Sequence, residues 1–466
     1  MKLKDILLST DVDVEVSGIS YNSRATKPGD VFVAVTGFQT DGHKYIPNAL
    51  ENGAVCVVCE RPQENIGVPC VVVENSRKAL AEMSCNFYGN PTKKINLIGV
   101  TGTNGKTTVT YLVKSILEAN GEKVGLMGTN KNMIGDVEYH TERTTPESLE
   151  LQQFFDDMVK AECTYGIMEV SSHSLDLYRV YGCNYKVGAF TNLTQDHLDF
   201  HGDMENYFLA KSKLFDMCDT GVVNADDMYG ARLCVKDNCT SYGIKNGTLM
   251  AENIEYGDKG VKFNCGNMKI DLGIPGVFSV YNALTAIGIC KACGIADEVI
   301  EKALNSAKGV KGRAEIVDCG KDFTLLIDYA HTPDGLENIL ESVKKFAKGR
   351  VVVVFGCGGD RDKTKRPKMG RVAGRIADFC IVTSDNPRTE EPDAIIRDIL
   401  EGMDDAIAEY VVIENRRDAI EYAIKHARKD DVIVLAGKGH EDYQILKNET
   451  IHFDEREVIK DILSKM

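Results

Sequence analysis

The sequence predicts an α/β protein with a small N-terminal α/β domain, a central phosphate-loop domain and a C-terminal Rossmann-like domain. Its 466 residues exceed what one hydrophobic core usually supports. Strand-length apolar runs alternate with helical segments along most of the chain. A glycine-rich turn near residue 102 joins a strand to a helix. We place the three domains at residues 1–88, 89–309 and 310–466.

The N-terminal domain is predicted from four short β-type runs, VEVSGISYNSR, DVFVAV, AVCVVCE and VPCVVVE, separated by turns. A helical stretch lies between them, and residues 77–88 indicate a helix that leads out of the domain. Cys56 and Cys59 form a lone CxxC with no second pair at zinc-site spacing. We therefore expect the fifteen cysteines to be reduced thiols, buried as small apolar residues rather than used for metal or disulfides.

The central and C-terminal domains show the alternation typical of parallel sheets. A strand (INLIGV), a glycine-rich turn and a helix (VTYLVKSILEANG) are followed by strand candidates at YGIMEV, KVGAFTNL and GVVNADD. Residues 242–272 suggest a polar hairpin, and residues 276–294 a helix. After a linker at KGVKGR, the strands FTLLIDYA, RVVVVFGCGGDRD, FCIVTSD and DVIVLAGKG alternate with helices, which favours a doubly wound sheet.

Charge and hydropathy argue against nucleic acid and membranes as partners. The net charge is −15, from 55 Lys and Arg against 70 Asp and Glu, and an acidic chain binds polyanions poorly. The first apolar stretch is too short for a signal peptide, and the longest apolar runs have strand length. We expect a cytoplasmic protein without membrane insertion, and a monomer.

The glycine-rich turn has the features of a phosphate loop. Its residues follow a strand and open a helix: Gly102, Thr103, Asn104, Gly105, Lys106, Thr107 and Thr108. In such a loop the backbone N–H groups hold phosphate, Lys106 reaches the β- and γ-phosphates and the Thr107 hydroxyl contacts Mg²⁺. Val100 stands where the strict Walker pattern has glycine, which weakens the interpretation as a GTPase or kinase. A P-loop NTPase switch, a nucleotide-binding regulator and a plain βα turn remain alternatives.

Two further segments carry candidate metal ligands. Glu169 ends the strand YGIMEV, where a carboxylate can hold Mg²⁺ beside a phosphate loop. His197 and His201 are spaced to share a helix face, a geometry that also suits zinc, although capping or packing explains them equally well. By pattern alone, Lys211 and Lys213 are ordinary surface lysines.

Taken together, the motifs resemble those of the Mur ligases. In chain order they are GTNGKTT, RTTPES, EVSSH, NLTQDHLDFHGDMENY, AKSKLF, YNALTA, GR, DYAHTPD, GGDRD, DNPR and GKGHEDYQ. The resemblance covers all three segments and implies a uridine-nucleotide domain, an ATPase domain and a Rossmann-like domain. It implies an ATP-dependent ligase that forms an acyl phosphate and adds meso-diaminopimelate to UDP-N-acetylmuramoyl-L-alanyl-D-glutamate in peptidoglycan synthesis. Addition of L-lysine and, more remotely, a folylpolyglutamate synthase are the alternatives.

The resemblance also implies roles for single residues. For the UDP-linked precursor these are Ser23, Thr144, Thr145, Ser171 and Arg179, although Leu177 stands where the family often has glutamine. For ATP they are the phosphate loop with Asn282, Arg313, Asp328 and His331. For Mg²⁺ they are Thr107, Glu169, His197 and Lys211, the last as a carbamate formed with CO₂. For the amino acid they are Arg361, Asp385, Asn386, Pro387, Arg388, Gly437 and Glu441.

The resemblance also singles out the residues expected to carry catalysis and substrate choice. Lys106, Glu169, His197 and Lys211 are the predicted catalytic residues. Arg388 follows the strand FCIVTS and can pair with the distal carboxylate of diaminopimelate, which L-lysine lacks.

Overall fold

The computed structural model describes residues 1–37, 40–141, 143–234 and 238–466. The chain divides into two compact units. One unit consists of Met1–Gly102, Gly121–Ala189 and Glu205–Gly221; the other consists of Thr103–Asn120, Phe190–Met204 and Val222–Met466. Among the described residues, every helix is too short or too polar to span a bilayer.

The N-terminal sheet is four-stranded and parallel, in the order β1-β2-β3-β4. Its strands are β1 (Gly18–Ser20), β2 (Asp30–Val33), β3 (Cys56–Cys59) and β4 (Cys70–Val72), and its helices are α1 (Leu3–Ile6), η1 (Gly42–Tyr45), α2 (Ile46–Glu51) and α3 (Ser76–Phe87). Alternate residues of β2 and β3 enter two different hydrophobic clusters. The sheet is therefore buried on both faces, as parallel sheets are. The four predicted strands and the helix leading out of the domain are confirmed.

A nine-stranded sheet has the order β13-β12-β11-β10-β5-β9-β6-β7-β8. Its strands are β5 (Asn96–Thr101), β6 (Val124–Met127), β7 (Asn132–Ile134), β8 (Val137–Tyr139), β9 (Tyr165–Glu169), β10 (Tyr185–Phe190), β11 (Cys218–Asn224), β12 (Cys239–Gly243) and β13 (Leu249–Met250). β5 is parallel to β9, and β9 is parallel to β6. Gly99 has no room for a side chain, because a Cβ there would lie 2.7 Å from the ring of Tyr185.

The central helices are α4 (Lys106–Ala119), α5 (Ser148–Lys160), α6 (Ser172–Asp176), α7 (Leu198–His201), α8 (Met204–Ser212), α9 (Met228–Leu233), α10 (Val277–Ala292) and α11 (Asp297–Asn305), with η2 (Pro91–Lys93) and η3 (Lys213–Asp216). The predicted hairpin at residues 242–272 is more than a hairpin. It contains the parallel pair β12 and β13 and an antiparallel sheet of β14 (Glu252–Tyr256), β15 (Val261–Cys265) and β16 (Met268–Leu272).

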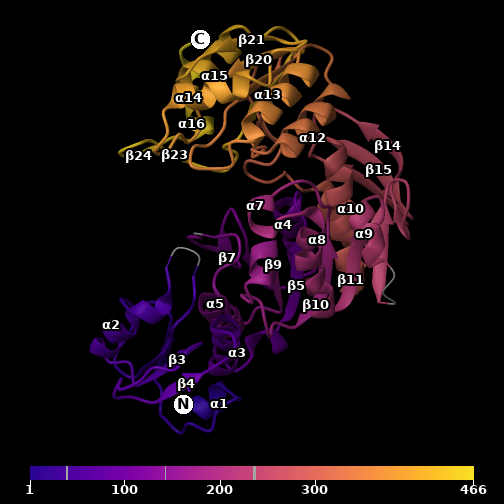
Figure 1. The fold of residues 1–466 in the computed structure, drawn as a ribbon. Coiled ribbons are helices and arrows are strands. Elements are labelled where there is room, and N and C mark those ends of the chain that lie inside the picture. The colour runs from indigo at the N-terminus through magenta and orange to yellow at the C-terminus, as the bar shows by residue number, and fades with distance from the viewer. Residues whose placement is uncertain (38–39, 142, 235–237) are drawn as a thin grey trace. The chain divides into compact units, whose positions relative to one another are not determined.

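The C-terminal part, orange to yellow in Figure 1, contains a six-stranded sheet in the order β17-β18-β22-β19-β20-β21. Its strands are β17 (Glu315–Val317), β18 (Thr324–Asp328), β19 (Val351–Phe355), β20 (Phe379–Val382), β21 (Glu409–Val412) and β22 (Val432–Ala436). All neighbours are parallel except β17 and β18. β22 lies between β18 and β19. The chain runs outward from β19 to β20 and β21 and then returns to add β22 next to β18, so the strand order reverses at this point. In such sheets the loops at the carboxyl ends next to this point bind ligands.

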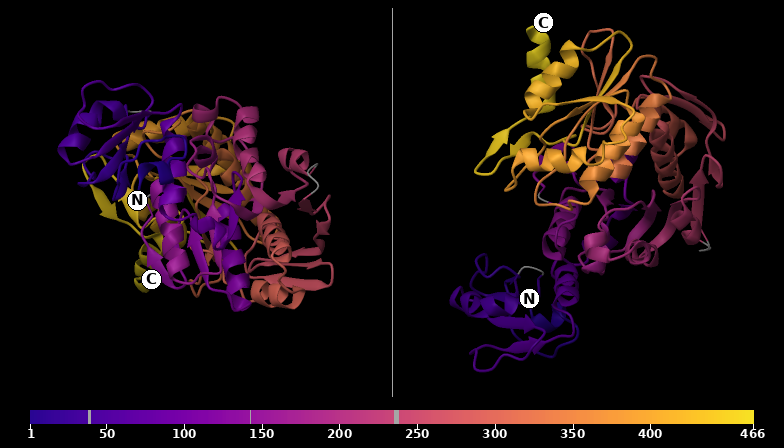
Figure 2. Two further views of the ribbon diagram at one scale, coloured as in Figure 1. Left: turned by 90° about the horizontal axis from the view of Figure 1, so that it is seen from below. Right: turned by 45° about the horizontal axis from the view of Figure 1, so that its top comes forward.

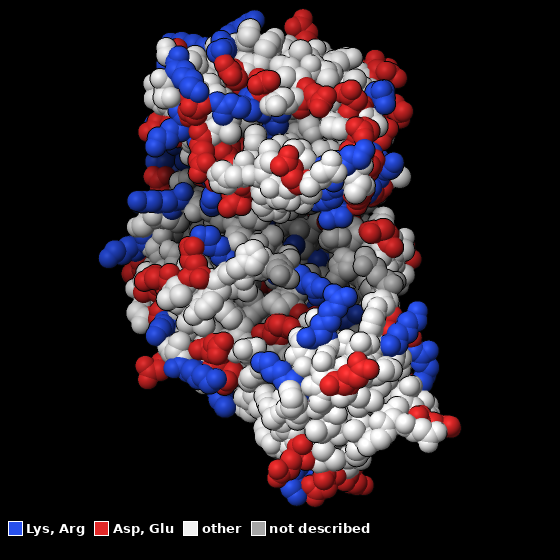
Figure 3. Space-filling view, turned by 90° about the vertical axis from the view of Figure 1, so that its left-hand side faces the viewer, with Lys and Arg blue, Asp and Glu red and all other residues white. Residues whose placement is uncertain are grey.

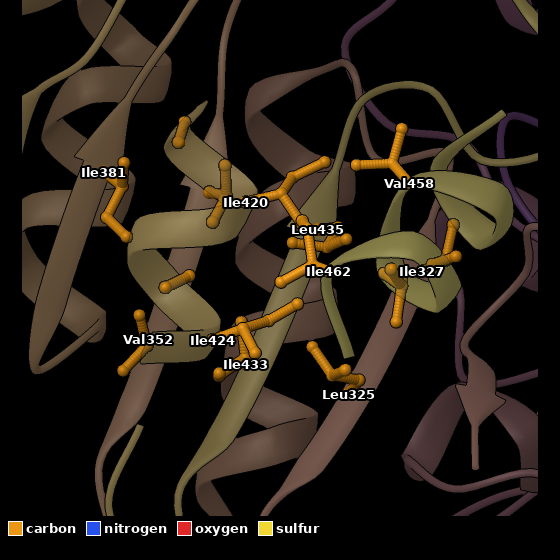
Figure 4. Packing of buried hydrophobic residues seen from close by; sticks show 14 of the residues in the cluster. Leu325, Ile327, Val352, Ile381, Ile420, Ile424, Ile433, Leu435, Val458 and Ile462 are labelled. Atoms are coloured by element: carbon orange, nitrogen blue, oxygen red, sulfur yellow. The ribbon is translucent and has the colours of Figure 1, made fainter. Parts of the chain in front are cut away.

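Helices cover both faces of the six-stranded sheet, as the right-hand view of Figure 2 shows. They are α12 (Pro333–Lys344), α13 (Lys365–Ile376), α14 (Pro392–Leu400), α15 (Arg416–Lys425) and α16 (Glu455–Ser464), and a hairpin of β23 (Tyr443–Ile445) and β24 (Thr450–His452) precedes α16. Figure 4 shows the cluster on the α15 and α16 face, where Ile420, Ile424 and Ile462 pack against Leu325, Ile327, Ile433 and Leu435. The predicted doubly wound sheet is confirmed.

The distribution of surface charge and the state of two cysteine thiols can both be described. On the face seen in Figure 3, acidic and basic side chains of the described residues are interspersed rather than gathered by sign. Cys56 and Cys59 are buried, and burial raises the pKa of the Cys59 thiol to about 12. Both thiols are free of disulfides, and buried protonated thiols are poor metal ligands.

Candidate active site

The phosphate loop has the geometry that its sequence predicts. β5 ends at Thr101, Gly102 and Gly105 both have positive φ angles (144° and 88°), and α4 begins at Lys106. A Cβ at residue 105 would lie 2.4 Å from Oδ1 of the buried Asn282, so only glycine fits. The ammonium of Lys106 donates to the carbonyl of Thr103 at 2.8 Å. This loop can therefore present backbone N–H groups, a helix N-terminus and an ammonium to an anion.

Arg313 connects the C-terminal part to this loop. Its Nη2 donates to Thr107 Oγ1 at 3.2 Å, and its guanidinium lies 4.7 Å from the ring centre of Tyr329. Asp328, at the end of β18, accepts from the backbone of Ala314 at 2.7 Å. Burial raises the pKa of Asp328, and the charge of Arg313 opposes that shift. Arg313 and Asp328 therefore lie near one another beside the phosphate loop, both partly buried.

The pKa of the neighbouring histidine, His331, is lowered. His331 Nδ1 lies 2.8 Å from the carbonyl of Tyr329. Burial lowers the pKa of His331, and nearby Lys365 lowers it further. A lowered pKa favours the neutral imidazole, which can form hydrogen bonds without adding a charge.

Sequence reasoning missed Asp334 as a site residue. It lies in the first turn of α12, and its Oδ2 accepts from Asn104 Nδ2 at 2.7 Å and from Thr194 Oγ1 at 2.8 Å. Asn192 also contacts the loop, through Oδ1 and the backbone N–H of Asn104 at 2.9 Å. The last letter of DYAHTPD was a signal for Asp334, but an acidic residue in a first helical turn has an ordinary explanation as a dipole partner.

Glu169 is a buried carboxylate at the end of β9. It is 1% exposed and accepts from both the backbone N–H and the hydroxyl of Thr129, each at 2.9 Å. Thr129 contacts Thr144 hydroxyl to hydroxyl at 3.0 Å, and Thr145 donates to the Glu169 carbonyl at 2.9 Å. Among the described residues no ion pair reaches this carboxylate. A buried carboxylate without a cationic partner is a suitable ligand for a hard cation.

The predicted precursor residues fall into one connected group and one separate residue. Arg179 donates to the Thr145 carbonyl at 3.1 Å and pairs with Glu147 at 2.8 Å. The backbone of Ser171 donates to Thr145 Oγ1 at 3.2 Å, and its hydroxyl caps α6. Ser23 follows β1 in the N-terminal sheet and is buried, and its carbonyl accepts from Asn52 at 2.8 Å.

Two sequence interpretations around α7 and α8 are wrong. Lys211 is not a surface residue: it is 1% exposed, donates to the Gly102 carbonyl at 2.9 Å and lies 4.7 Å from the ring centre of Tyr207. His197 does not share a helix face with His201, because α7 begins one residue later and His197 has a left-handed backbone (φ 53°). The His197 ring is half-exposed, 3.3 Å from Asp196.

The candidate metal ligands can be compared by their donor atoms. The hydroxyl of Thr107 and the carboxylate of Glu169 are hard oxygen ligands, and a carbamate on the buried Lys211 would be a third. No group of three or more His, Cys, Asp or Glu is arranged for a metal ion within the described ranges.

The amino-acid candidates lie at the carboxyl ends of β20 and β22. Asn386 Nδ2 donates to Glu441 Oε2 at 2.9 Å, and a Cβ on Gly437 would lie 3.2 Å from Asp385 Oδ2. Arg388 has a left-handed backbone (φ 53°) after Pro387, and its Nη1 donates to the Gly359 carbonyl at 2.9 Å. These residues, which the sequence spreads over more than fifty positions, are brought together by strand order.

Arg361 is placed differently from the other amino-acid candidates. It is exposed and its Nη1 donates to the Asp360 carbonyl at 3.0 Å. It lines an open cavity of about 500 Å³ together with Asp199, Asp360, Asp362, Lys363 and Glu390. The loop that carries it is anchored by the buried Arg366, which pairs with Glu390 at 2.8 Å. A guanidinium on an anchored loop, facing open space, is suited to a ligand carboxylate.

Comparison with known proteins identifies the class. Three family models match: "Mur ligase family, catalytic domain" at residues 15–88, "Mur ligase middle domain" at 100–290 and "Mur ligase, glutamate ligase domain" at 312–439. Together with the full-length relatives below, these matches show that the chain belongs to the Mur ligase family, and they confirm the predicted three-domain fold.

The relatives name a particular ligase. The chain is 52% identical over 465 residues to the "UDP-N-acetylmuramoyl-L-alanyl-D-glutamate--2,6-diaminopimelate ligase" of Clostridium botulinum, covering 97% of this chain and 96% of the relative. It is also 52% identical to the protein of the same name from Caldanaerobacter subterraneus, covering 100% and 99%. A solved structure of a ligase with that name has a TM-score of 0.72 at 30% identity, covering 100% of this chain and 99% of that one. A Mycobacterium tuberculosis folylpolyglutamate synthase shares the fold at 17% identity, with a TM-score of 0.61 over 76% of this chain.

Proposed function

We propose that this chain is an ATP-dependent ligase that joins meso-diaminopimelate to UDP-N-acetylmuramoyl-L-alanyl-D-glutamate. Relatives that carry this name match the chain over its full length. The observation that carries the proposal is the arrangement inside one compact unit of Thr107, Arg313 and the Asn386–Glu441 pair. Arg313 precedes β17 and the Asn386–Glu441 pair follows β20 and β22, so the proposed nucleotide and amino-acid contacts share one Rossmann-like sheet.

The proposed reaction has two steps. First, a carboxylate oxygen of the precursor's glutamate attacks the γ-phosphorus of ATP, and ADP leaves with the electrons of the broken P–O bond. Next, the amine of the amino acid attacks the acyl phosphate carbon; an amide forms, phosphate leaves and the nitrogen loses a proton. Phosphoryl transfer needs positioning and charge compensation more than covalent help from the protein.

The residues of this chain have separate tasks in that reaction. Lys106 and the loop N–H groups hold the β- and γ-phosphates, and Arg313 compensates charge that develops on the transferred group. Thr107, Glu169, His197 and the carbamate of Lys211 would hold Mg²⁺, which supplies Lewis-acid charge when bound. Asn282, Asp328 and His331 are proposed to contact the nucleotide.

The remaining predicted residues recognise the two other substrates. Thr144, Thr145, Ser171 and Arg179 are proposed to hold the peptide part of the precursor, and Ser23 its uridine part. Arg361, Arg388 and the cluster of Asp385, Asn386, Pro387, Gly437 and Glu441 are proposed to hold the amino acid. We further propose domain boundaries at residues 88 and 309, a cytoplasmic location, a monomer and no nucleic-acid partner.

The test is phosphate release by purified protein with ATP, the dipeptide precursor and a panel of amino acids. We expect release only when precursor and meso-diaminopimelate are both present. Release that needs no amino acid would instead indicate an NTPase switch, and equal release with L-lysine would indicate the lysine-adding form. Omitting Mg²⁺, or stripping CO₂ from the buffer, separately tests the cation and the carbamate.

A further inference from the structure

A fully buried lysine lies inside the proposed amino-acid site. Lys438, between Gly437 and Gly439 after β22, is 0% exposed. Its ammonium lies 3.1 Å from Asn386 Oδ1, 3.3 Å from Asp385 Oδ1 and 3.3 Å from Glu441 Oε2. An ammonium has three N–H donors, and burying it is strongly unfavourable unless acceptors and opposite charges surround it. The ammonium therefore donates to Asn386 and Glu441 and forms an ion pair with Asp385.

These contacts fix the orientation of the Asn386 amide. Its Oδ1 accepts from Lys438 and from the backbone N–H of Ile445 at 3.0 Å. Its Nδ2 must then point the other way, and it donates to Glu441 Oε2 at 2.9 Å. Without the ammonium, Asn386 Oδ1 would keep one donor, the Ile445 N–H, and the amide would be held less firmly.

Glu441 is fixed on one side and open on the other. Its Oε2 accepts from both Asn386 and Lys438. No hydrogen bond within the described part of the chain reaches Oε1, which leaves that oxygen for a ligand. Burial raises the pKa of Glu441, and Lys438 is the largest opposing influence. Lys438 thus favours the charged form of the carboxylate.

The local charge has one excess negative unit. Two carboxylates, Asp385 and Glu441, face one ammonium, Lys438. The adjoining buried Arg416 is paired with its own carboxylate, Glu455, at 2.8 Å. A ligand ammonium would balance the cluster, while the half-buried guanidinium of Arg388 is available to a ligand carboxylate. Neighbouring negative and positive groups of this kind match a zwitterionic α-amino-acid centre.

We propose that Lys438 is a positioning residue that fixes Asn386 and Glu441 so that they recognise the ammonium of the substrate's distal amino-acid centre. The inference rests on the proposed function, because meso-diaminopimelate has such a centre at the end that does not react. L-lysine presents only an ammonium there. The competing explanation is that Lys438 only neutralises Asp385 and stabilises the fold.

The test is a double-mutant cycle of Lys438→Met and Glu441→Gln in the full-length enzyme, with steady-state kinetics for meso-diaminopimelate. Each single variant should raise KM about 30-fold or more and change kcat less, since the distal centre is bound but does not react. Because Lys438 and Glu441 are proposed to serve the same ligand ammonium, their effects should not multiply, and the double variant should exceed the worse single variant by no more than about threefold. Lys438→Gln, which keeps hydrogen bonding without charge, should fall between wild type and Lys438→Met.

The control is Lys114→Met. Lys114 is also buried, but it is paired with Glu118 at 2.5 Å on α4. The Lys114→Met variant should keep the KM for meso-diaminopimelate within about twofold of the wild-type value. The affinity for ADP should be unchanged in all folded variants. An unaltered KM in Lys438→Met and Lys438→Gln, or single effects that multiply in the double variant, would overturn the positioning role. Failure of the wild type to use meso-diaminopimelate would instead reject the proposed function.

Discussion

Replacing Arg388 with alanine should erase the preference for meso-diaminopimelate over L-lysine. The Arg388 guanidinium is held by its Nη1, which donates to the Gly359 carbonyl at 2.9 Å and lies 3.4 Å from the Asn386 carbonyl. Within the described residues no hydrogen bond reaches Nε or Nη2. The free edge of the fork can therefore take a carboxylate through two charge-assisted bonds.

The size of the effect follows from that geometry. A hydrogen bond to a charged group contributes about 1.5–3 kcal/mol, and two on one half-buried guanidinium are screened and not additive. We take about 3 kcal/mol, which corresponds to a rise of about 150-fold in the KM for meso-diaminopimelate. The KM for L-lysine should hardly change, since L-lysine has no carboxylate to pair. Arg388→Lys keeps the charge but loses the fork, so its KM should rise about tenfold.

The assay is competition between the two amino acids, with kcat and KM measured for each variant. The backbone strain of residue 388 (φ 53°) is common to Arg, Lys and Ala, so it does not distort the comparison. Lys447→Ala is the control. Lys447 lies in the turn of the nearby β23–β24 hairpin and forms an exposed ion pair with Glu391. If Arg388→Ala keeps its KM within about twofold of wild type, the assignment of the distal carboxylate is wrong.

Four other changes have expected outcomes. Lys211→Ala should lower kcat by at least about a hundredfold, with partial rescue by short carboxylic acids; undiminished turnover would contradict a carbamate role. Lys106→Ala should abolish turnover yet retain calorimetric binding of the UDP-linked precursor, and loss of both would indicate misfolding. Glu455→Gln should lower the free energy of urea unfolding by about 3 kcal/mol, because it leaves the buried Arg416 without its carboxylate; a change below about 1 kcal/mol would contradict this. Burial lowers the pKa of His440 to about 3 from 6.5, so only the unfolded chain takes up that proton as the pH falls below about 6.5. The folded protein should therefore lose about 1–2 kcal/mol of stability by about pH 5, and His440→Asn should not show this loss. Equal acid sensitivity in both proteins would refute the prediction.

Local patterns were enough to predict most of the fold. The parallel strands are continuous apolar runs because both faces of each sheet are buried, and such runs can be recognised without tertiary information. The phosphate loop was recognisable because Gly102 and Gly105 are required by positive φ angles and Lys106 opens a helix. These features depend on a few neighbouring residues, which the sequence displays directly.

The parts that were not predicted depend on packing between distant segments. Lys211 resembles a surface lysine until α8 is folded against the carbonyl of Gly102. Lys438 lies between two glycines and has an unremarkable pattern, and its burial depends on β20 and β22 ending close together. Asp334 is 140 positions from Thr194, so no local signal could connect them. The start of α7 after His197 was misplaced because a left-handed residue has no reliable signal outside glycine and asparagine.

The most direct test of the central claim is the mass of the product formed from ATP and the UDP-linked dipeptide precursor with an equimolar mixture of meso-diaminopimelate and L-lysine. We predict that the precursor gains the mass of meso-diaminopimelate less one water, with one ADP and one phosphate formed per product. A precursor that gains the mass of L-lysine less one water, or ADP formed without any new amide, would contradict the account.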